Sequence, residues 1–211
     1  MHRVNEQRSW PELLKNFIVL EGLDGSGTTT QLELLESRFK DGGKSGFFTC
    51  EPTAGKIGRI IREILTGTME ADPFTLAYLF AADRNHHLTD RADGILFHLD
   101  RGETAVTDRY FFSSLAYQSL GCGYDFVRRL NESFPLPEHC IFIDVPVDLC
   151  QERISARNGR EIFDHEQTQE KILSLYMRAL DDFGSKGMKI HIIDGTMEKE
   201  KIAEKIWKTL F

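Results

Sequence analysis

The chain has 211 residues, of which 41% are hydrophobic and 28% are charged, the balance of an ordinary globular protein rather than of a disordered or fibrous chain. This length suits one domain, or one domain with a small movable insertion. The 26 basic and 33 acidic residues give a net charge of −7, which argues against binding along a nucleic-acid backbone, because such binding needs a basic surface. The longest apolar runs are far shorter than the ~20 residues of a transmembrane helix, so we expect no membrane span.

The first sixteen residues are charged, contain a proline and lack the apolar core of a secretory signal. We interpret residues 1–16 as a short polar extension before the first strand. The four cysteines form no CxxC pair and lie far apart, so we expect neither a zinc site nor a disulfide framework. Reduced thiols are typical of a cytoplasmic protein.

Short apolar runs alternate with longer amphipathic stretches along the rest of the chain. The predicted strands, mostly β-branched or aromatic, are Phe17–Glu21, Gly46–Cys50, Thr104–Asp108, Cys140–Val145 and Lys189–Asp194. The predicted helices are Thr28–Lys40, Lys56–Leu65, Pro73–Asp93, Ser113–Leu120, Tyr124–Phe134, Val147–Arg157, Glu166–Phe183 and Glu198–Leu210. Strands that are apolar on both faces and alternate with helices predict an α/β fold, with a five-stranded parallel sheet flanked by helices. Residues 156–165 are short and charged, and we interpret them as a mobile lid.

The segment FIVLEGLDGSGTTTQ predicts a buried strand, a glycine loop and the start of a helix. Such a loop turns backbone N–H groups toward an anion, and the helix directs its positive end at the same point. In the pattern G-x-x-x-x-G-K-[ST], Gly22 and Gly27 match, Thr29 takes the hydroxyl position that ligates magnesium, and Thr28 replaces the lysine. A tight turn without a ligand is the alternative. The predicted ATP-binding residues are Gly22, Leu23, Asp24, Gly25, Ser26, Gly27, Thr28, Thr29 and Thr30.

Four further motifs follow the glycine loop: EPT at 51–53, FAADR at 80–84, DRYFFSSLAYQ at 108–118 and ERISARNGREIFD at 152–164. In this order and at these distances, the chain resembles the thymidylate kinase family from about Phe17 to the C-terminus. The resemblance implies a three-layer P-loop NTPase fold over residues 17–211, phosphoryl transfer from ATP to dTMP, Mg²⁺ as cofactor, a lid near 156–165 and a homodimer.

Phe80 and Arg84 are four residues apart on a predicted helix and therefore share a face. An aromatic ring beside a planar cation suits a nucleobase and its carbonyl. A core phenylalanine and a solvated surface arginine are the alternatives. By resemblance, Phe80 packs against thymine and Arg84 reaches its O4.

Asp108 ends a predicted strand, at the edge of the sheet where α/β proteins bind ligands. A carboxylate there can hold magnesium together with Thr29, and Arg109 suits a phosphate group. An internal ion pair between Asp108 and Arg109 is the alternative. The carboxylate of Asp24 would repel phosphate, so it suits a sugar hydroxyl; by resemblance it binds the 3′-OH of the acceptor.

Ser113, Ser114 and Tyr117 follow on the next predicted helix. By resemblance, Ser114 and Tyr117 read the base edge and crowd the 2′ position against ribose. We predict that all three contact the substrate.

Glu51 follows the second predicted strand, as a substrate-binding residue by resemblance or simply as a turn residue before Pro52. Many family members place an arginine before this glutamate to contact the acceptor phosphate, whereas this chain has Cys50. Lys56 and Arg59 lie nearby on the next predicted helix and are candidates to compensate for that charge.

The charged segment contains Arg153, Arg157 and Arg160. In the family this region closes over ATP and brings arginines to the transferring phosphates, although a solvated helix end is the alternative here. Some members carry a catalytic arginine in the glycine loop, at the position of Gly25. We therefore expect Arg157 or Arg160 to replace the missing lysine. The predicted catalytic residues are Asp24, Arg109, Arg157 and Arg160.

Three functions remain open at this point. The first is a dTMP kinase that uses Mg-ATP. The second is a nucleotide-binding sensor or scaffold without catalysis, because Thr28 and Cys50 both remove positive charge from phosphate positions. The third is a deoxynucleoside kinase, which would need a pocket for an unphosphorylated 5′-OH.

Overall fold

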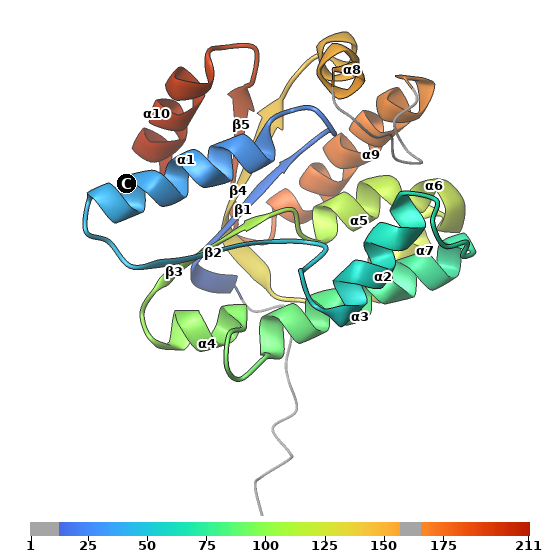
Figure 1. Ribbon diagram of the computed structural model, residues 1–211, viewed down its shortest axis with the longest axis horizontal. Coiled ribbons are helices and arrows are strands. Elements are labelled where there is room, and N and C mark those ends of the chain that lie inside the picture. Colours follow the sequence, from blue (N-terminus) through green and yellow to red (C-terminus); the bar gives the residue numbers. More distant parts are fainter. Residues whose placement is uncertain (1–12, 157–165) are drawn as a thin grey trace, which may run out of the picture.

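The computed structural model describes residues 13–156 and 166–211 and has an α/β architecture (Figure 1). Within these residues, five strands form one sheet in the order β2-β3-β1-β4-β5, and every neighbouring pair is parallel. The strands are β1 (Leu13–Gly22), β2 (Gly46–Cys50), β3 (Thr104–Asp108), β4 (Leu136–Asp144) and β5 (Lys189–Asp194). The predicted five-stranded parallel sheet is therefore confirmed.

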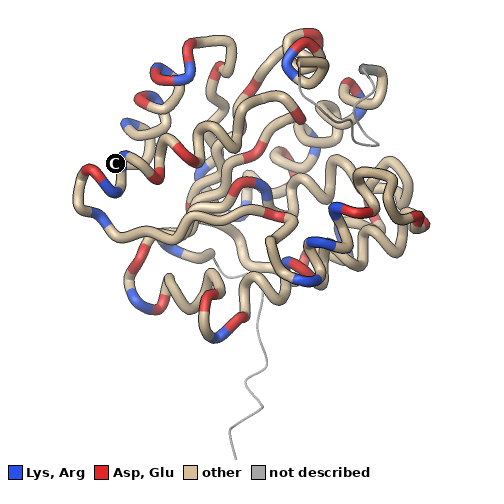
Figure 2. The backbone as a smooth tube through the Cα atoms, viewed as in Figure 1, with Lys and Arg blue, Asp and Glu red and all other residues tan. Residues whose placement is uncertain are grey.

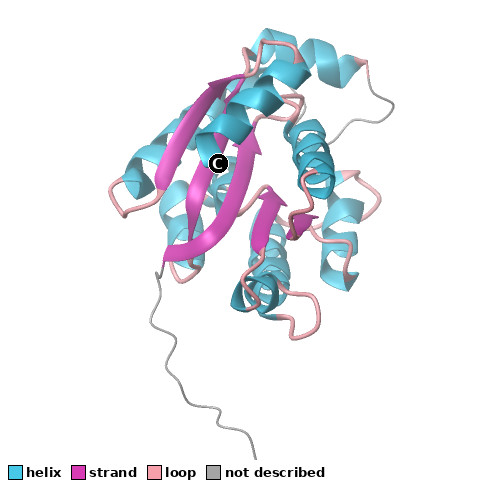
Figure 3. Ribbon diagram, turned by 90° about the vertical axis from the view of Figure 1, so that its left-hand side faces the viewer, coloured by secondary structure: helices cyan, strands magenta, loops and turns pink. Residues whose placement is uncertain are grey.

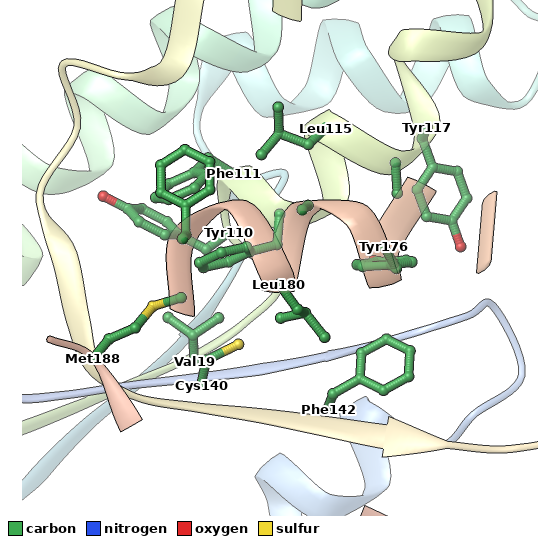
Figure 4. Close-up of a cluster of buried hydrophobic side chains, with 14 of the residues drawn as sticks. Val19, Tyr110, Phe111, Leu115, Tyr117, Cys140, Phe142, Tyr176, Leu180 and Met188 are labelled. Carbon is green, nitrogen blue, oxygen red and sulfur yellow. The ribbon is translucent and has the colours of Figure 1, made fainter. Parts of the chain in front are cut away.

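Helices connect the strands and cover both faces of the sheet (Figure 3). They are α1 (Thr28–Asp41), α2 (Lys56–Leu65), α3 (Pro73–Thr89), α4 (Ile95–Asp100), α5 (Phe111–Tyr117), α6 (Ser119–Cys122), α7 (Tyr124–Asn131), α8 (Val147–Ser155), α9 (Glu166–Gly184) and α10 (Lys199–Leu210). On one face, Leu35 and Phe39 of α1 and Ile202 of α10 are buried against the strands. The other face packs mainly against α5 and α9, and Figure 4 shows Leu180 of α9 on the side of that helix nearer to Val19 and Phe142 of the strands.

The helical connections switch from one face of the sheet to the other between β1 and β3. The helix that follows β1 lies on one face, and the helix that follows β3 lies on the other. Because these strands are neighbours, their carboxyl ends border a crevice, the usual ligand position in open α/β sheets.

The first predicted strand was too short, because β1 begins at Leu13 rather than Phe17. Leu13 pairs with Leu136, and the register shifts before Ile18. Lys15 and Asn16 lie in this irregular stretch and are exposed, so they interrupt the apolar pattern. The strand thus includes four residues of the predicted N-terminal extension. Its partner β4 likewise begins at Leu136, four residues before the predicted start.

The predicted helix Pro73–Asp93 is in fact two helices, α3 and α4. Asp90 ends the first, since its carboxylate accepts hydrogen bonds from the backbone N–H groups of Ala92 and Asp93 at 2.8 and 3.2 Å. A side chain that bonds its own backbone in this way favours a turn over a helix. The predicted helix Ser113–Leu120 is similarly divided into α5 and α6, and α7 ends at Asn131, before Phe134.

No helix in the described ranges is both long and apolar enough to cross a membrane. Basic and acidic residues are interspersed along the helices (Figure 2), as on a mixed charged surface. All four cysteines carry free thiols, and Cys140 and Cys150 are buried.

Candidate functional site

The glycine loop between β1 and α1 has the geometry of an anion cradle (Figure 1). Gly25 and Gly27 have φ values of +86° and +95°, which side chains rarely tolerate. A Cβ at Gly25 would also lie 2.6 Å from the carbonyl oxygen of Cys150. At Gly22 it would lie 3.0 Å from the carbonyl oxygen of Ile143. All three glycines are therefore required by the backbone, and Gly25 leaves no room for an arginine.

Arg153 of α8 is hydrogen-bonded to this loop. Its Nη1 donates to the carbonyl oxygens of Gly25 at 3.2 Å and Ser26 at 3.4 Å, and its Nη2 donates to that of Gly195 at 3.3 Å. Arg153 thus links the glycine loop to the turn after β5. Arg157 and Arg160, the predicted catalytic arginines, and nearly all of the predicted lid lie outside the described residues.

Thr29 and Asp108 meet at the carboxyl ends of β1 and β3. The Thr29 hydroxyl donates to Oδ2 of Asp108 at 2.6 Å. Oδ1 of Asp108 is buried and has no hydrogen-bond partner within the described part of the chain, so it is available to a ligand. Carboxylate and hydroxyl oxygens are hard donors of the kind that Mg²⁺ prefers. The two residues therefore fit the predicted magnesium site.

Arg109 links the loop to the neighbouring helices. It pairs with Asp24 through Nη2, and its Nη1 donates to Oγ of Ser113 and to the phenol oxygen of Tyr176, both at 3.1 Å. Its φ is +72°, a conformation that costs energy for a residue with a side chain. Asp24 is also held by its backbone N–H, which donates to the Tyr117 hydroxyl at 3.0 Å. The predicted Asp24 and Arg109 are thus in contact, although 85 residues apart.

A pocket of about 220 Å³ opens beside this ion pair. Its lining residues are Asp24, Glu51, Pro52, Arg62, Leu65, Thr66, Phe80, Arg84, Arg109, Tyr110, Ser113, Tyr117 and Gln118. Seven of the eight predicted substrate-binding residues are among them. Ser114, the eighth, lies behind the wall and accepts a hydrogen bond from Nη2 of Arg84 at 3.0 Å.

Arg84 is not the solvated surface arginine that was one alternative, because only 1% of its surface is exposed. Its Nε and Nη2 lie 2.9 and 2.8 Å from Oε2 of Glu51, and its Nη1 donates to Asn131. The other Glu51 oxygen lies 3.1 Å from Nδ1 of His87. Glu51 is therefore the counter-ion of Arg84 rather than a simple turn residue.

The two candidates for the charge missing at position 50 are not among the residues that line the pocket. Lys56 and Arg59 are exposed and do not line the pocket, whereas Arg62 does. Arg62 donates to the carbonyl oxygens of Pro52 and Thr53. The sequence gives no signal for this choice, because it depends on which face of α2 meets the pocket.

Sequence reasoning also missed Gln118 and Tyr176. Gln118 is 5% exposed, lines the pocket, and its Oε1 has no hydrogen-bond partner among the described residues. Its position four residues after Ser114 could have indicated a shared helix face. Tyr176 is buried on α9 and contacts Arg109. No local sequence pattern could have predicted this contact, because the two residues lie in distant segments of the chain.

A glycine loop at the crevice of a parallel α/β sheet, beside a pocket that holds paired cations and carboxylates, defines a P-loop nucleotide kinase. A family model described as "Thymidylate kinase" matches residues 20–206. The chain belongs to the thymidylate kinase family, a family of nucleoside monophosphate kinases.

Named relatives agree with this assignment. A protein of Treponema pallidum named "Putative thymidylate kinase" is 41% identical over 197 residues, which cover 92% of this chain and 94% of that protein. A protein of the same name from Aeropyrum pernix is 37% identical, over 84% of this chain and 85% of its own. A "Probable thymidylate kinase" of Methanococcus aeolicus is 34% identical, over 93% and 96%.

Proposed function

We propose that the protein transfers the γ-phosphoryl group of Mg-ATP to dTMP, giving dTDP and ADP. One observation carries the proposal: the ion pair of Asp24 and Arg109 belongs both to the glycine loop and to the adjoining pocket. A donor phosphate on the loop and an acceptor in the pocket would then meet at this pair. Such proximity is the main requirement of phosphoryl transfer, which is mostly positioning and charge stabilisation.

The donor side consists of the loop, the N-terminus of α1 and the pair of Thr29 and Asp108. Inward N–H groups of the loop would hold the donor phosphates. Thr29 and the free Oδ1 of Asp108 would hold Mg²⁺, which supplies positive charge to those phosphates when bound. Arg153 holds the loop in place through the carbonyl oxygens of Gly25 and Ser26.

The acceptor side is the pocket. We infer that Arg109 binds the acceptor phosphate and that Asp24 accepts a hydrogen bond from the sugar 3′-OH. Phe80 offers a ring for the base, and Arg84, fixed by Glu51, presents its guanidinium to a base carbonyl. Ser113 and Tyr117 line the same pocket. We infer that Tyr117 crowds a 2′ substituent and that Ser114 acts through Arg84.

The assay that tests this function measures ADP release from Mg-ATP with dTMP, thymidine or dUMP as acceptor. We expect turnover with dTMP at roughly 1–100 s⁻¹, as for other kinases, and none with thymidine, because Arg109 would have no phosphate to bind. Thymidine turnover equal to that of dTMP would instead establish a deoxynucleoside kinase.

The inactive nucleotide-binding alternative is favoured by Thr28 and Cys50, which replace two cations. It predicts dTMP binding without turnover, and rescue of turnover by Thr28→Lys. On our proposal Thr28→Lys changes kcat by less than about tenfold, since lid arginines supply the charge.

We predict that Arg157→Ala or Arg160→Ala lowers kcat about a hundredfold, the effect of removing one donor to a transition-state oxyanion. Arg178→Ala is the matched control, since Arg178 is an exposed arginine of α9 that pairs with Asp125. Wild-type kcat in both lid variants would refute the idea that either arginine replaces the lysine.

We also propose that the protein works in the cytoplasm as a homodimer, as the family resemblance implies. Phe74 and Tyr78 of α3 are 44% and 55% exposed, and both rings contact Phe126 of α7 edge-on. An exposed aromatic patch of this kind is typical of a protein interface. Light scattering on the purified protein tests the mass, and a monomer at micromolar concentration would contradict the dimer.

A further inference from the structure

Glu21 is a fully buried carboxyl group one residue before the glycine loop. Its Oε2 accepts hydrogen bonds from the Ser113 hydroxyl at 2.6 Å and the Tyr176 hydroxyl at 3.0 Å. Its Oε1 accepts from the backbone N–H groups of Tyr110 at 2.9 Å and Ser113 at 3.3 Å. Four donors thus converge on a side chain that lies outside the predicted site.

The two hydroxyls stand between Glu21 and Arg109. Nη1 of Arg109 lies 3.1 Å from each of them, and they lie 2.7 Å from one another. Figure 4 shows Tyr176 between Phe142 of β4 and Tyr117 of α5, and the ring centroids lie 5.3 and 6.0 Å from these neighbours. Packing therefore fixes the phenol group in place between carboxylate and guanidinium.

The number of hydrogens that each group can donate decides which atoms face Arg109. A hydroxyl has one hydrogen to donate and two lone pairs, whereas a carboxylate only accepts and a guanidinium only donates. When Glu21 is ionised, the hydroxyl hydrogens of Ser113 and Tyr176 are directed at Oε2, with one of them shared across the 2.7 Å contact between the two hydroxyls, so that lone pairs face Arg109. When Glu21 is protonated, its own O–H takes a lone pair of one hydroxyl, so that fewer lone pairs remain for Arg109.

We propose that Glu21 is a positioning residue for Arg109: as a carboxylate it orients the hydroxyls of Ser113 and Tyr176 to accept hydrogen bonds from the guanidinium, and as a neutral acid it weakens this hold. The inference rests on the proposed function, in which Arg109 binds the acceptor phosphate. It implies that dTMP affinity depends on the ionisation of a residue that never touches dTMP.

The carboxyl group of Glu21 changes its charge near neutral pH. Burial raises its pKa to about 7, against the opposing effects of the Ser113 hydrogen bond and the Arg109 charge. Among the described residues, the other titratable groups that Glu21 acts on are the phenol of Tyr176 and the thiol of Cys140, and burial raises the pKa of each well above its ordinary value. Of this set, Glu21 is the acid that titrates near neutral pH. The hold of the two hydroxyls on Arg109 is therefore stronger above about pH 7 than below it, while Asp24 and the Gly22 carbonyl remain its partners throughout.

The test compares the pH dependence of KM for dTMP in the wild type and in Glu21→Gln, between about pH 5.5 and 9. An amide donates an N–H at every pH, so the variant cannot restore the carboxylate arrangement. At about pH 8 we expect its KM for dTMP to be about tenfold higher, the loss of one charge-assisted hydrogen bond, with KM for ATP unchanged. The wild-type KM should approach that of the variant at low pH, because both then lack the carboxylate.

The second ionisation of the dTMP phosphate, near pH 6, contributes equally to both proteins and cancels in their ratio. A ratio of KM values that stays at one over the whole range would overturn the inference. Tyr176→Phe is the second variant, since it keeps Glu21 and removes one hydroxyl; we expect a KM for dTMP about threefold higher, from one neutral hydrogen bond. Unchanged KM in Tyr176→Phe would overturn it as well.

Calorimetric Kd values for dTMP without ATP separate this inference from the proposed function. If the wild type binds dTMP without turnover, the ratio of Kd values against pH still supports or overturns the role of Glu21. If it turns dTMP over while the ratio remains at one, only the positioning role is lost.

Discussion

Arg109→Met is expected to lower kcat/KM for dTMP about a thousandfold, the upper range for removal of one preorganised donor from a transition state. The guanidinium contacts Asp24, Ser113, Tyr176 and a loop carbonyl, so it is preorganised before substrate binds. Methionine fills much of the same volume but supplies neither charge nor N–H groups. Steady-state kinetics with dTMP as the varied substrate measures the effect.

Two further variants test whether a loss of kcat/KM in Arg109→Met comes from the guanidinium itself. Arg101→Met removes a 60% exposed arginine outside the pocket and should leave kcat/KM within twofold of the wild type, since exposed pairs contribute little. Arg109→Lys keeps the charge but not the planar fork that spans several partners, so we expect an intermediate loss. If Arg109→Met kept wild-type kcat/KM while folded by circular dichroism, the acceptor-phosphate role would be excluded.

Glu51→Gln is expected to lower the free energy of unfolding by about 3 kcal/mol, the lower range for breaking a buried ion pair from one side. The side chains of Arg84 and Glu51 are 1% and 2% exposed, so the guanidinium would remain buried beside a neutral amide. Loss of this counter-ion should also raise KM for dTMP, because Arg84 would no longer be held at the pocket wall. Urea unfolding measures the first effect and steady-state kinetics the second.

The matched control is Glu204→Gln, which breaks the surface pair of Arg38 and Glu204 at 38% and 45% exposure and should cost less than about 1 kcal/mol. A double variant, Glu51→Gln with Arg84→Met, should recover part of the lost stability, since it also removes the unpaired charge. Equal unfolding midpoints for Glu51→Gln and Glu204→Gln would contradict the buried pair.

Local patterns were sufficient for the sheet and the loop. Each predicted strand overlaps an observed one, because strands buried on both faces are continuous apolar runs. The boundaries failed where a polar residue had a local partner or an irregular position, as at Asn16 in β1 and at Asp90 after α3. At Asn16 the strand continues although the apolar pattern stops, whereas at Asp90 the helix ends although the helical pattern continues.

Some residues of the site could likewise be predicted from the sequence, and others could not. Gly25 and Gly27 could be predicted, since a left-handed backbone demands glycine whatever surrounds it. The choice of Arg62 over Arg59 could not, because it depends on which face of α2 meets the pocket. The burial of Arg84 was equally hidden, since Glu51 and Asn131 lie 33 and 47 residues from it.

The sequence by itself determined the α/β class, the parallel sheet, the glycine loop and the resemblance to one kinase family. These depend on the order of short segments and on backbone requirements that each residue carries with it. Only the tertiary structure decided how Glu21 and Tyr176, 155 residues apart, come to face Arg109 through shared hydroxyls. Hydrogen-bond direction and the desolvation of a carboxyl group depend on every neighbour in space, and those neighbours come from segments that the chain brings together only when it folds.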